Sequence, residues 1–306
     1  MQISIIIPAY NAARTLEECI NSCLTQETDP SVQIEILVID DCSTDETAQI
    51  LRDNFSDEIT VITHTENRGL SAARNSGLRQ SAGSVLFFLD ADMIAEPAFV
   101  RSHLEYYESD PEICGIVNEF VPGKDVPDNK FTRYLYHEKR GASQAGEGGG
   151  VPPHHFLFSG TSIRRAIYET AGGFDERISN YGGEDTEYAY RLSRQIECNF
   201  IYSEKTVLHH NHYRTLENTC SLLYQYGKET LPHLVETYPE LKPHVGLSAP
   251  NHVFIPKVLR LLAAFPFTVI LARGCFNMLP APLSHGFVKI LLGVSLLRGY
   301  FQSDDN

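Results

Sequence analysis

Short runs of β-branched and other apolar residues alternate with stretches of helical periodicity over roughly the first 120 residues. The strand candidates are residues 3–7, 35–39, 60–63, 85–89 and 113–117. Between the first two runs, apolar residues recur at the spacing of one helix face: Leu16, Ile20, Cys23 and Leu24. Strands that alternate with helices are typical of a parallel sheet covered on both faces. We therefore expect an α/β fold with a mostly parallel sheet.

Later residues predict further elements and one break in the pattern. Ser43-Thr44-Asp45-Glu46 has the form of a capping box, which predicts that a helix starts at this point. Residues 122–153 mix charged residues with a glycine-rich stretch, as in mobile loops that cover binding sites. Beyond them we expect helices over residues 164–171 and 184–195, and a strand near residues 199–202.

Composition is that of an ordinary globular protein and excludes several classes. The 306 residues are 42% hydrophobic and 21% charged. A net charge of −14 argues against a nucleic-acid partner, because phosphate backbones are met by clustered Lys and Arg. The seven cysteines include no Cys-x-x-Cys pair, so we expect neither a disulfide framework nor a cysteine zinc site. From this cysteine usage we expect a protein of the reducing cytoplasm, either free or peripheral on the membrane. No basic segment precedes the first apolar run, so we interpret that run as a strand.

The C-terminal tail differs in charge from the rest of the chain. Residues 1–250 carry 20 basic and 37 acidic side chains, whereas residues 251–306 carry five and two. The apolar runs at 261–272 and 288–297 are shorter than the roughly 20 apolar residues that a bilayer span requires. Flanking basic residues are typical of segments that lie on an anionic membrane surface. The alternative, weighted equally, is a helical cap that packs on the remaining chain or forms a homodimer interface.

Polar side chains follow three predicted strands at their carboxyl ends, where open parallel sheets bind ligands. Four of these side chains are carboxylates, which would repel one another unless a cation or hydrogen-bond donors lay among them. The segments are Pro8-Ala9-Tyr10-Asn11 after the first strand, Asp40-Asp41-Cys42-Ser43 after the second and Asp90-Ala91-Asp92 after the fourth.

The two acidic pairs, Asp40 with Asp41 and Asp90 with Asp92, have different simple explanations. If the chain stays extended after the fourth strand, Asp90 and Asp92 point to the same side. Such a pair suits Mg²⁺ or Mn²⁺, which prefer oxygen ligands and leave positions for phosphates. Asp40 and Asp41, taken alone, are explained equally well by helix capping or by the charge preference of a helix N-terminus.

Five blocks occur together in a characteristic order. They are Ile5-Ile6-Ile7-Pro8-Ala9-Tyr10-Asn11, Val38-Ile39-Asp40-Asp41-Cys42-Ser43-Thr44-Asp45, Asn67-Arg68-Gly69-Leu70-Ser71-Ala72-Ala73-Arg74-Asn75, Phe88-Leu89-Asp90-Ala91-Asp92, and Gly183-Glu184-Asp185 followed by Arg191. Together they resemble the family 2 glycosyltransferases with the Rossmann-like GT-A fold. The resemblance implies a catalytic domain over residues 1–215, with a nucleotide-binding half to residue 120, and a helical, apolar extension over residues 216–306. Cys42 stands where this family usually has Gly.

The resemblance implies a metal-dependent, inverting transfer of sugar from a nucleotide-sugar, with a UDP-sugar the first expectation. The acceptor would be a hydroxyl of a glycan or lipid-linked molecule, as in cell-surface polysaccharide or glycoconjugate synthesis. In such enzymes the first strand end and the second Asp of the Asp-Asp pair hold the nucleotide base. Arg74 would pair with the diphosphate through its guanidinium fork; the alternative for Arg74 is a surface ion pair. The candidate donor residues are Pro8, Tyr10, Asp40, Asp41, Arg74 and Asp90.

Inverting transfer needs a base for the acceptor hydroxyl and stabilisation of the departing diphosphate. The resemblance assigns the base to Asp185, with Glu184 beside it orienting the acceptor or the base. Taken alone, both would be explained as acidic residues favoured at a helix N-terminus. The resemblance assigns Asp92 to a Mn²⁺ or Mg²⁺ site and makes His209 the first choice as its histidine ligand. The register leaves His210 and His212 open.

Phe158-Ser159-Gly160-Thr161 is similar to the family's small-residue segment, in which Gly160 would leave room for the donor sugar. A tight turn explains this glycine almost as well. Two other functions fit the same fold, a nucleotidyltransferase and a non-catalytic nucleotide-sugar-binding protein. The first would normally show a glycine-rich basic loop after the first strand, which Pro8-Ala9-Tyr10-Asn11 is not. A metallohydrolase is disfavoured because the sequence has no His-Glu-x-x-His element.

Overall fold

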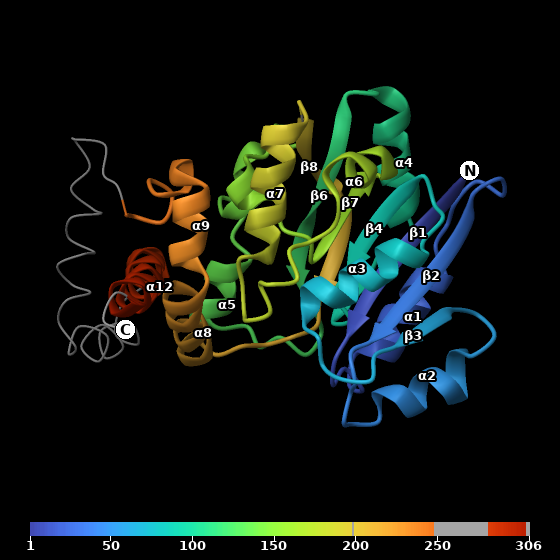
Figure 1. Cartoon of the computed structure of the whole chain (residues 1–306), viewed down its shortest axis with the longest axis horizontal. Helices are drawn as coiled ribbons and strands as arrows, with labels where there is room; N and C mark the ends of the chain where they lie inside the picture. The colour runs from blue at the N-terminus through green and yellow to red at the C-terminus, as the bar shows by residue number, and fades with distance from the viewer. Residues whose placement is uncertain (198, 248–280, 304–306) are drawn as a thin grey trace. The chain divides into compact units, whose positions relative to one another are not determined.

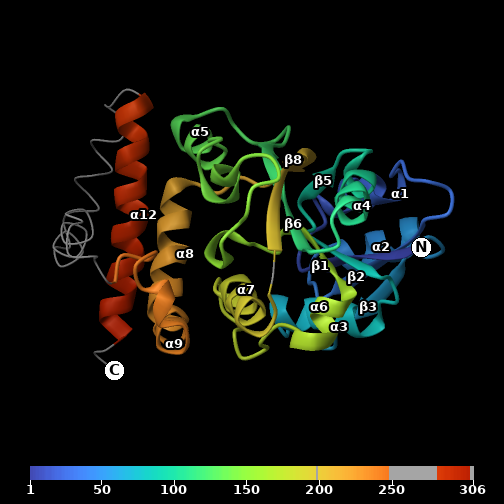
Figure 2. The same ribbon diagram turned by 90° about the horizontal axis from the view of Figure 1, so that it is seen from above.

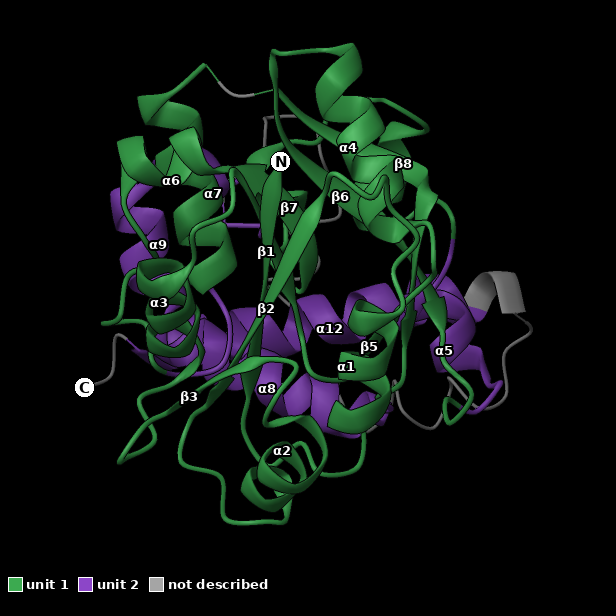
Figure 3. Ribbon diagram, turned by 90° about the vertical axis from the view of Figure 1, so that its right-hand side faces the viewer, with its two compact units in different colours: residues 1–126, 138–179, 184–212 green, residues 127–137, 180–183, 213–306 purple. Residues whose placement is uncertain are grey.

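The computed structural model describes residues 1–197, 199–247 and 281–303. The chain forms two compact units, coloured separately in Figure 3. Unit 1 consists of Met1–Val126, Glu138–Ser179 and Glu184–His212, and unit 2 of Pro127–His137, Asn180–Gly183 and Tyr213–Asn306. Unit 2 therefore includes two short segments upstream of residue 215. The sequence had suggested a single boundary at that residue.

Unit 1 is built on an eight-stranded sheet with the order β3-β2-β1-β4-β7-β6-β8-β5 (Figure 1). Its strands are β1 (Gln2–Ala9), β2 (Gln33–Asp40), β3 (Thr60–Thr63), β4 (Val85–Leu89), β5 (Met93–Ala95), β6 (Ile113–Pro122), β7 (Gly160–Arg164) and β8 (Asn199–His210). Strands β1 to β4 pair in parallel, as do β6 and β8. The α/β class and all the predicted strands are confirmed. β7 and β5 run antiparallel to their neighbours, which the sequence pattern did not indicate.

Helices cover both faces of this sheet, because successive side chains of a strand point to opposite faces. Ile5 belongs to one buried cluster and its neighbour Ile6 to the other. On the face of Ile5 lie α1 (Leu16–Leu24), α2 (Thr47–Phe55) and α4 (Phe99–Ser109), and on the face of Ile6 lie α3 (Leu70–Gln80), α6 (Arg165–Ala171) and α7 (Glu184–Gln195), as Figure 2 shows. The predicted helices α1, α6 and α7 are confirmed.

The capping box predicted after the second strand is wrong. Helix α2 begins at Thr47, whose N–H donates to Asp45 Oδ1 at 3.0 Å. Asp45 Oδ2 accepts from the N–H of Ala13 at 3.1 Å, and Ser43 Oγ accepts from the N–H of Asn11 at 3.0 Å. These side chains therefore join the loops after β1 and β2, and tertiary partners replace the local cap.

The stretch predicted as a plain loop over residues 122–153 contains helical turns. Helix α5 (Lys130–Leu135) is capped by Asn129, whose side chain accepts from the N–H groups of Phe131 and Thr132. Two 3₁₀ turns follow, η1 (Gly141–Ala145) and η2 (Pro153–His155). The composition concealed a capping box, since Asn129 and Thr132 bond each other reciprocally.

Unit 2 is helical in its described part, as expected for the C-terminal extension. Its elements after residue 213 are α8 (Leu216–Glu229), α9 (Leu231–Thr237), the 3₁₀ turn η3 (Pro239–Leu241) and α12 (Ala281–Ser303). Cys220 of α8 packs with Val288 and Leu291 of α12. The apolar run at 288–297 lies in α12, and the run at 261–272 falls outside the described residues. No helix in the described ranges is long and apolar enough to span a membrane.

Candidate active site

The polar residues after β1, β2 and β4 meet at one edge of the sheet. In the parallel register Ala9 lies opposite Asp40, and β1 pairs on its other side with β4. Neighbouring parallel strands end at the same edge, so Tyr10, Asp41 and Asp90 are brought together there. The tertiary structure thus collects residues that lie 80 positions apart in the chain.

The turns that leave β1 and β2 have unusual backbone conformations. Asn11 has φ 51° and Cys42 has φ 62°, in the left-handed region that favours glycine. Asn11 Oδ1 accepts from the N–H of Thr44 at 2.8 Å and so ties the two turns together. Tyr10 beside them is 51% exposed, which leaves its ring available to a ligand. The conformation of Cys42 gives a physical reason for glycine at this position in similar proteins.

Pro8 and Asp40 lie within the paired strand ends rather than beyond them. Pro8 is opposite Ile39 in the β1–β2 register. Asp40 is buried, and its Oδ1 accepts from the N–H of Ser43 at 3.0 Å. Asp40 therefore closes the turn that presents Asp41.

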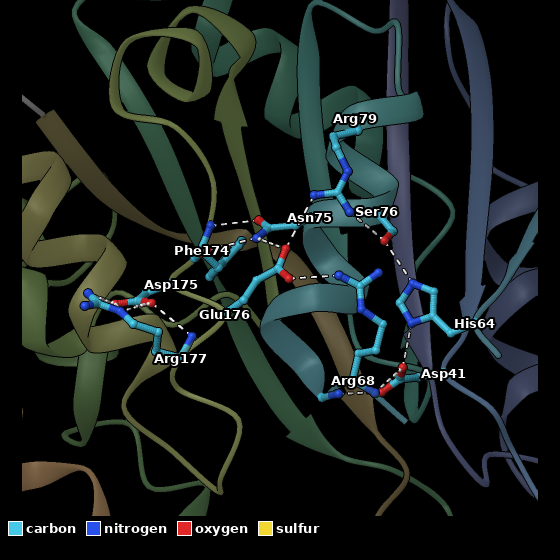
Figure 4. A network of polar contacts seen from close by, with 11 residues as sticks. Asp41, His64, Arg68, Asn75, Ser76, Arg79, Phe174, Asp175, Glu176 and Arg177 are labelled. Atoms are coloured by element: carbon cyan, nitrogen blue, oxygen red, sulfur yellow. Dashed lines mark hydrogen bonds and ion pairs between the residues drawn. The ribbon is translucent and has the colours of Figure 1, made fainter. Parts of the chain in front are cut away.

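Asp41 is buried in a set of hydrogen-bond donors, drawn in Figure 4. Its Oδ1 lies 2.6 Å from Nδ1 of His64 and accepts from the N–H of Arg68 at 2.9 Å. Its Oδ2 accepts from the N–H of Gly69 at 2.8 Å. The carboxylate thus holds the start of α3 against the end of β2.

Arg74 joins three of the acidic residues in what we call the Arg74 cluster: Arg74, Asp90, Glu184 and Asp185. Its Nη1 lies 2.6 Å from Asp185 Oδ1 and 3.6 Å from Glu184 Oε1, and its Nη2 lies 3.3 Å from Asp90 Oδ1. Nη2 also donates to the carbonyl of Phe158 at 3.2 Å. Arg74 is 1% exposed, so the alternative of a surface ion pair is wrong.

The Arg74 cluster contains more carboxylates than its single guanidinium can balance. Burial raises the pKa of Glu184 to about 7, Asp185 adds to this effect, and Arg74 opposes it. Desolvation also raises the pKa of Asp90 to about 7; Arg74 opposes this rise and Asp92 adds to it. Even so, 30% of the Asp90 side chain stays exposed. Within the described ranges Glu184 Oε2 is a buried atom with no hydrogen-bond partner. A cation or donor-rich ligand would lower the energy of this arrangement.

The chain turns between Asp90 and Asp92 instead of continuing as a strand. The N–H of Met93 donates to the carbonyl of Asp90 at 3.0 Å, which closes the turn. The expectation of an extended segment with both carboxylates on one side is therefore wrong. Asp90 faces Arg74, whereas Asp92 faces the end of β8.

Two histidines of the segment at the end of β8 face Asp92. Its Oδ2 lies 3.6 Å from Nε2 of His210 and 3.8 Å from Nδ1 of His212. His209 Nε2 instead lies 3.2 Å from Glu96 Oε1. Adjacent strand residues point to opposite faces, so His209 and His210 cannot both face Asp92. Across the described residues, no set of three or more His, Cys, Asp or Glu side chains is arranged to hold a metal ion by itself.

Gly160 is the first residue of β7 and pairs with Leu89 of β4, so the alternative of a tight turn is wrong. A Cβ atom at this position would overlap Leu208 Cδ1 and lie 3.1 Å from Phe120 Cε1. Packing within the sheet therefore gives Gly160 a structural reason that does not involve a ligand.

His64 was missed by the sequence reasoning. It directly follows β3, and Thr63 lies opposite Asp40 in the β2–β3 register, which brings His64 beside Asp41. The available signal was its position at a strand end, the same signal that identified Asp41 and Asp90.

Comparison with known proteins gives a family match over more than half of the chain. The model of the family described as glycosyl transferase family 2 matches residues 4–169. Validoxylamine A glucosyltransferase of Streptomyces hygroscopicus subsp. jinggangensis is 26% identical over 284 residues, which cover 81% of this chain and 64% of that protein. The chain thus spans less than two thirds of that relative's length.

Two solved structures share the fold at low sequence identity. The mannosyltransferase PcManGT of Pyrobaculum calidifontis, in complex with GDP-Man and Mn²⁺, is similar with a TM-score of 0.64 and 19% identity, covering 97% of this chain and 86% of that one. S. aureus TarS 1–349 in complex with UDP is similar with a TM-score of 0.55 and 18% identity, covering 100% and 92%. At these identities the likeness supports the fold.

Proposed function

The chain belongs to glycosyl transferase family 2, and from this premise we propose that it transfers a sugar from a nucleotide-sugar to an acceptor hydroxyl with inversion. The observation that carries this proposal is the Arg74 cluster. There one buried guanidinium bonds Asp90, at the end of a strand of the nucleotide-binding half, and Asp185, at the start of α7. Donor-side and acceptor-side carboxylates thus share one site.

Asp185 is the proposed base. Its side chain is 14% exposed, so it is largely desolvated yet open to a substrate group. The contact with Arg74 at 2.6 Å fixes the orientation of Oδ1 and leaves Oδ2 for the proton of the acceptor hydroxyl. Glu184 lies behind it, more deeply buried, and helps to orient the pair.

Asp92, with a histidine of the β8 end, is the proposed metal site for Mn²⁺ or Mg²⁺. His210 and His212 suit this role better than His209, because they face Asp92. Such ions need one or two carboxylates and take further oxygens from substrate phosphates, so a partial protein site fits them. When bound, the ion would stabilise the charge of the departing diphosphate.

The nucleotide would lie at the ends of β1 and β2, with UDP the first expectation. Tyr10 offers an exposed ring for stacking, and Asp41 offers a carboxylate oxygen to a base N–H. Arg74 is buried against the carboxylates, so its proposed role is to hold Asp90 in place beside the donor. The acceptor class that we propose is a glycan or lipid-linked hydroxyl.

Transfer from a panel of nucleotide-sugars, with and without Mn²⁺, tests the proposed function. Asp185→Asn should bind donor normally and lose roughly 10²–10⁴-fold in transfer rate, because an amide cannot take the hydroxyl proton. Asp92→Ala should lose metal-dependent donor binding. Transfer at the wild-type rate by Asp185→Asn would show that the base is a different residue.

A further inference from the structure

We infer that His64 is a positioning residue for nucleotide-base selectivity, because it links Asp41 to a hydrogen-bond chain that runs from Arg79 through Ser76. This inference rests on the proposed function, because it takes Asp41 as the group that accepts a base N–H. His64, Ser76 and Arg79 would act through Asp41 and would not touch the nucleotide themselves.

The chain of contacts is continuous in Figure 4. Arg79 Nη2 lies 2.9 Å from Ser76 Oγ, and Ser76 Oγ lies 2.9 Å from Nε2 of His64. Nδ1 of His64 lies 2.6 Å from Asp41 Oδ1. The side chains of His64 and Asp41 are 6% and 5% exposed, so solvent competes little for these bonds.

Donor and acceptor chemistry assigns one direction to the chain. A guanidinium only donates, so Ser76 Oγ accepts from Arg79 and still has one hydrogen to give. A carboxylate oxygen accepts, so Nδ1 of His64 carries the ring hydrogen that it donates to Asp41 Oδ1. Nε2 of this tautomer is the acceptor, and it takes the hydrogen of Ser76 Oγ.

The donors around Asp41 leave it little remaining capacity. A carboxylate offers about four lone-pair sites. Three of these accept from His64 Nδ1 and from the N–H groups of Arg68 and Gly69. Among the residues that the structure describes, none occupies the second site on Oδ2, which suits a base that presents a ring N–H, such as uracil or guanine. Cytosine and adenine present a ring nitrogen lone pair at the corresponding edge and would be repelled.

The loop that carries Arg68 also has anchors that do not involve His64. Arg68 Nη2 donates to Glu176 Oε2 at 2.9 Å, and Asn75 Nδ2 donates to Glu176 Oε1 at 3.0 Å. Asn75 also bonds the backbone of Phe174 through both atoms of its amide. Loss of His64 should therefore free a lone pair of Asp41 while the loop keeps its place.

Isothermal titration of the full chain with UDP and with CDP, at saturating Mn²⁺, tests this inference. His64→Gln reaches toward Ser76 but removes the donor to Asp41, and we expect the preference for UDP over CDP to fall roughly tenfold. His64→Asn places an amide N–H near the position of Nδ1 and should keep most of the preference.

His103 provides a matched control. It is also buried, with Nδ1 2.7 Å from Ser162 Oγ and Nε2 2.6 Å from Asn118 Oδ1. His103→Gln should lower the melting temperature and leave the UDP preference unchanged. An equal loss of preference in His103→Gln and His64→Gln would overturn the inference, because general destabilisation would then explain both.

The outcomes separate the inference from the proposed function. If the wild type prefers UDP and His64→Gln keeps the full preference, the inference fails and the proposed function stands. If the wild type binds no nucleoside diphosphate, the proposed function fails and the inference falls with it. If His64→Gln does not fold, Ser76→Ala replaces it, since it removes the hydroxyl that bonds Nε2 of His64. An unchanged preference in Ser76→Ala would overturn the inference.

Discussion

At the scale of single residues, backbone conformation and burial decide what each side chain of the site can do. Among the described residues, Asn11 and Cys42 are the non-glycine positions with positive φ. Asparagine tolerates this region, whereas cysteine is strained in it. Both lie in the turns that present Tyr10 and Asp41, so the strain is located where the proposed nucleotide site needs a fixed shape.

Substitution of Cys42 measures this strain. Cys42→Gly relieves the left-handed conformation but increases the entropy of the unfolded chain, so we expect stability to change by less than about 1 kcal/mol. Cys42→Val should be about 1–2 kcal/mol less stable than wild type, because a branched side chain is disfavoured at φ 62°. Urea unfolding compares the two variants. Equal stability of the valine and glycine variants would contradict the proposed strain.

Glu184 predicts how stability depends on pH. Its pKa is raised to about 7 by burial, above the ordinary value of 4.5, so the folded state holds a proton that the unfolded state loses. The stabilisation is complete below pH 4.5 and declines as the pH rises toward 7. In the presence of a chelator, the melting temperature of the wild type should therefore fall between pH 5 and pH 8 more than that of Glu184→Gln. An equal fall in melting temperature from pH 5 to pH 8 in the two proteins would argue against a raised pKa of Glu184.

At the scale of elements, two glycines determine how closely the helices of unit 2 approach. Gly227 of α8 faces α12, where an added Cβ atom would overlap the carbonyl oxygen of Leu296. Gly299 of α12 faces α8 in the same way, against the carbonyl oxygen of Tyr224. Backbone therefore packs on backbone, a contact that any larger side chain would force apart.

Replacing glycines of these helices with alanine tests whether close packing outweighs the higher intrinsic helix propensity of alanine. Gly227→Ala should lower the free energy of unfolding by about 1–3 kcal/mol, although alanine is the better helix former. Gly286 of α12 is the matched control, because an added Cβ there meets no atom within 4 Å. Gly286→Ala should raise stability by up to about 1 kcal/mol. Stabilisation by both substitutions, seen in urea unfolding, would show that the helices are not in close contact.

At the scale of the whole molecule, the distribution of charge suggests where the protein works. The chain carries a net charge of −14, yet residues 251–306 hold five basic and two acidic side chains. An acidic body would be repelled by anionic lipid, whereas a basic, apolar tail would be attracted to it. We propose that the tail brings the enzyme to a membrane-borne acceptor.

Flotation with vesicles of anionic lipid tests this proposal. Lys257→Gln, Arg260→Gln and Arg273→Gln, combined in one variant, should lower vesicle binding roughly a hundredfold at low salt, from about 1 kcal/mol for each basic residue. The binding of the wild type should weaken as salt is added.

A second triple variant controls for net charge. Arg14, Arg101 and Lys205 lie in unit 1 with side chains 69%, 49% and 67% exposed, and their ion pairs are with exposed partners of little energetic weight. Replacing them with Gln changes the total charge equally and should not weaken vesicle binding. Equal loss in both triple variants would assign the effect to overall charge and not to the tail.

The amino-acid sequence by itself determined the elements whose signal is local. Periods of two and of 3.6 residues are properties of neighbouring positions, so the strands β1 to β4 and the helices α1, α6 and α7 were predictable. The polar residues after β1, β2 and β4 were recognisable for the same reason, since each set directly follows an apolar run. Their assembly at one sheet edge followed from parallel pairing.

Only the tertiary structure decided the contacts between distant segments. The antiparallel directions of β5 and β7 depend on strand order. The pairing of β5 with β8 in turn decides that His210, and not His209, lies beside Asp92. Arg74 meets Asp185 across 111 positions of sequence, and His64 meets Asp41 across 23. No periodicity encodes such pairs, because their energy comes from desolvation and hydrogen bonding that exist only once the sheet and its helices have packed.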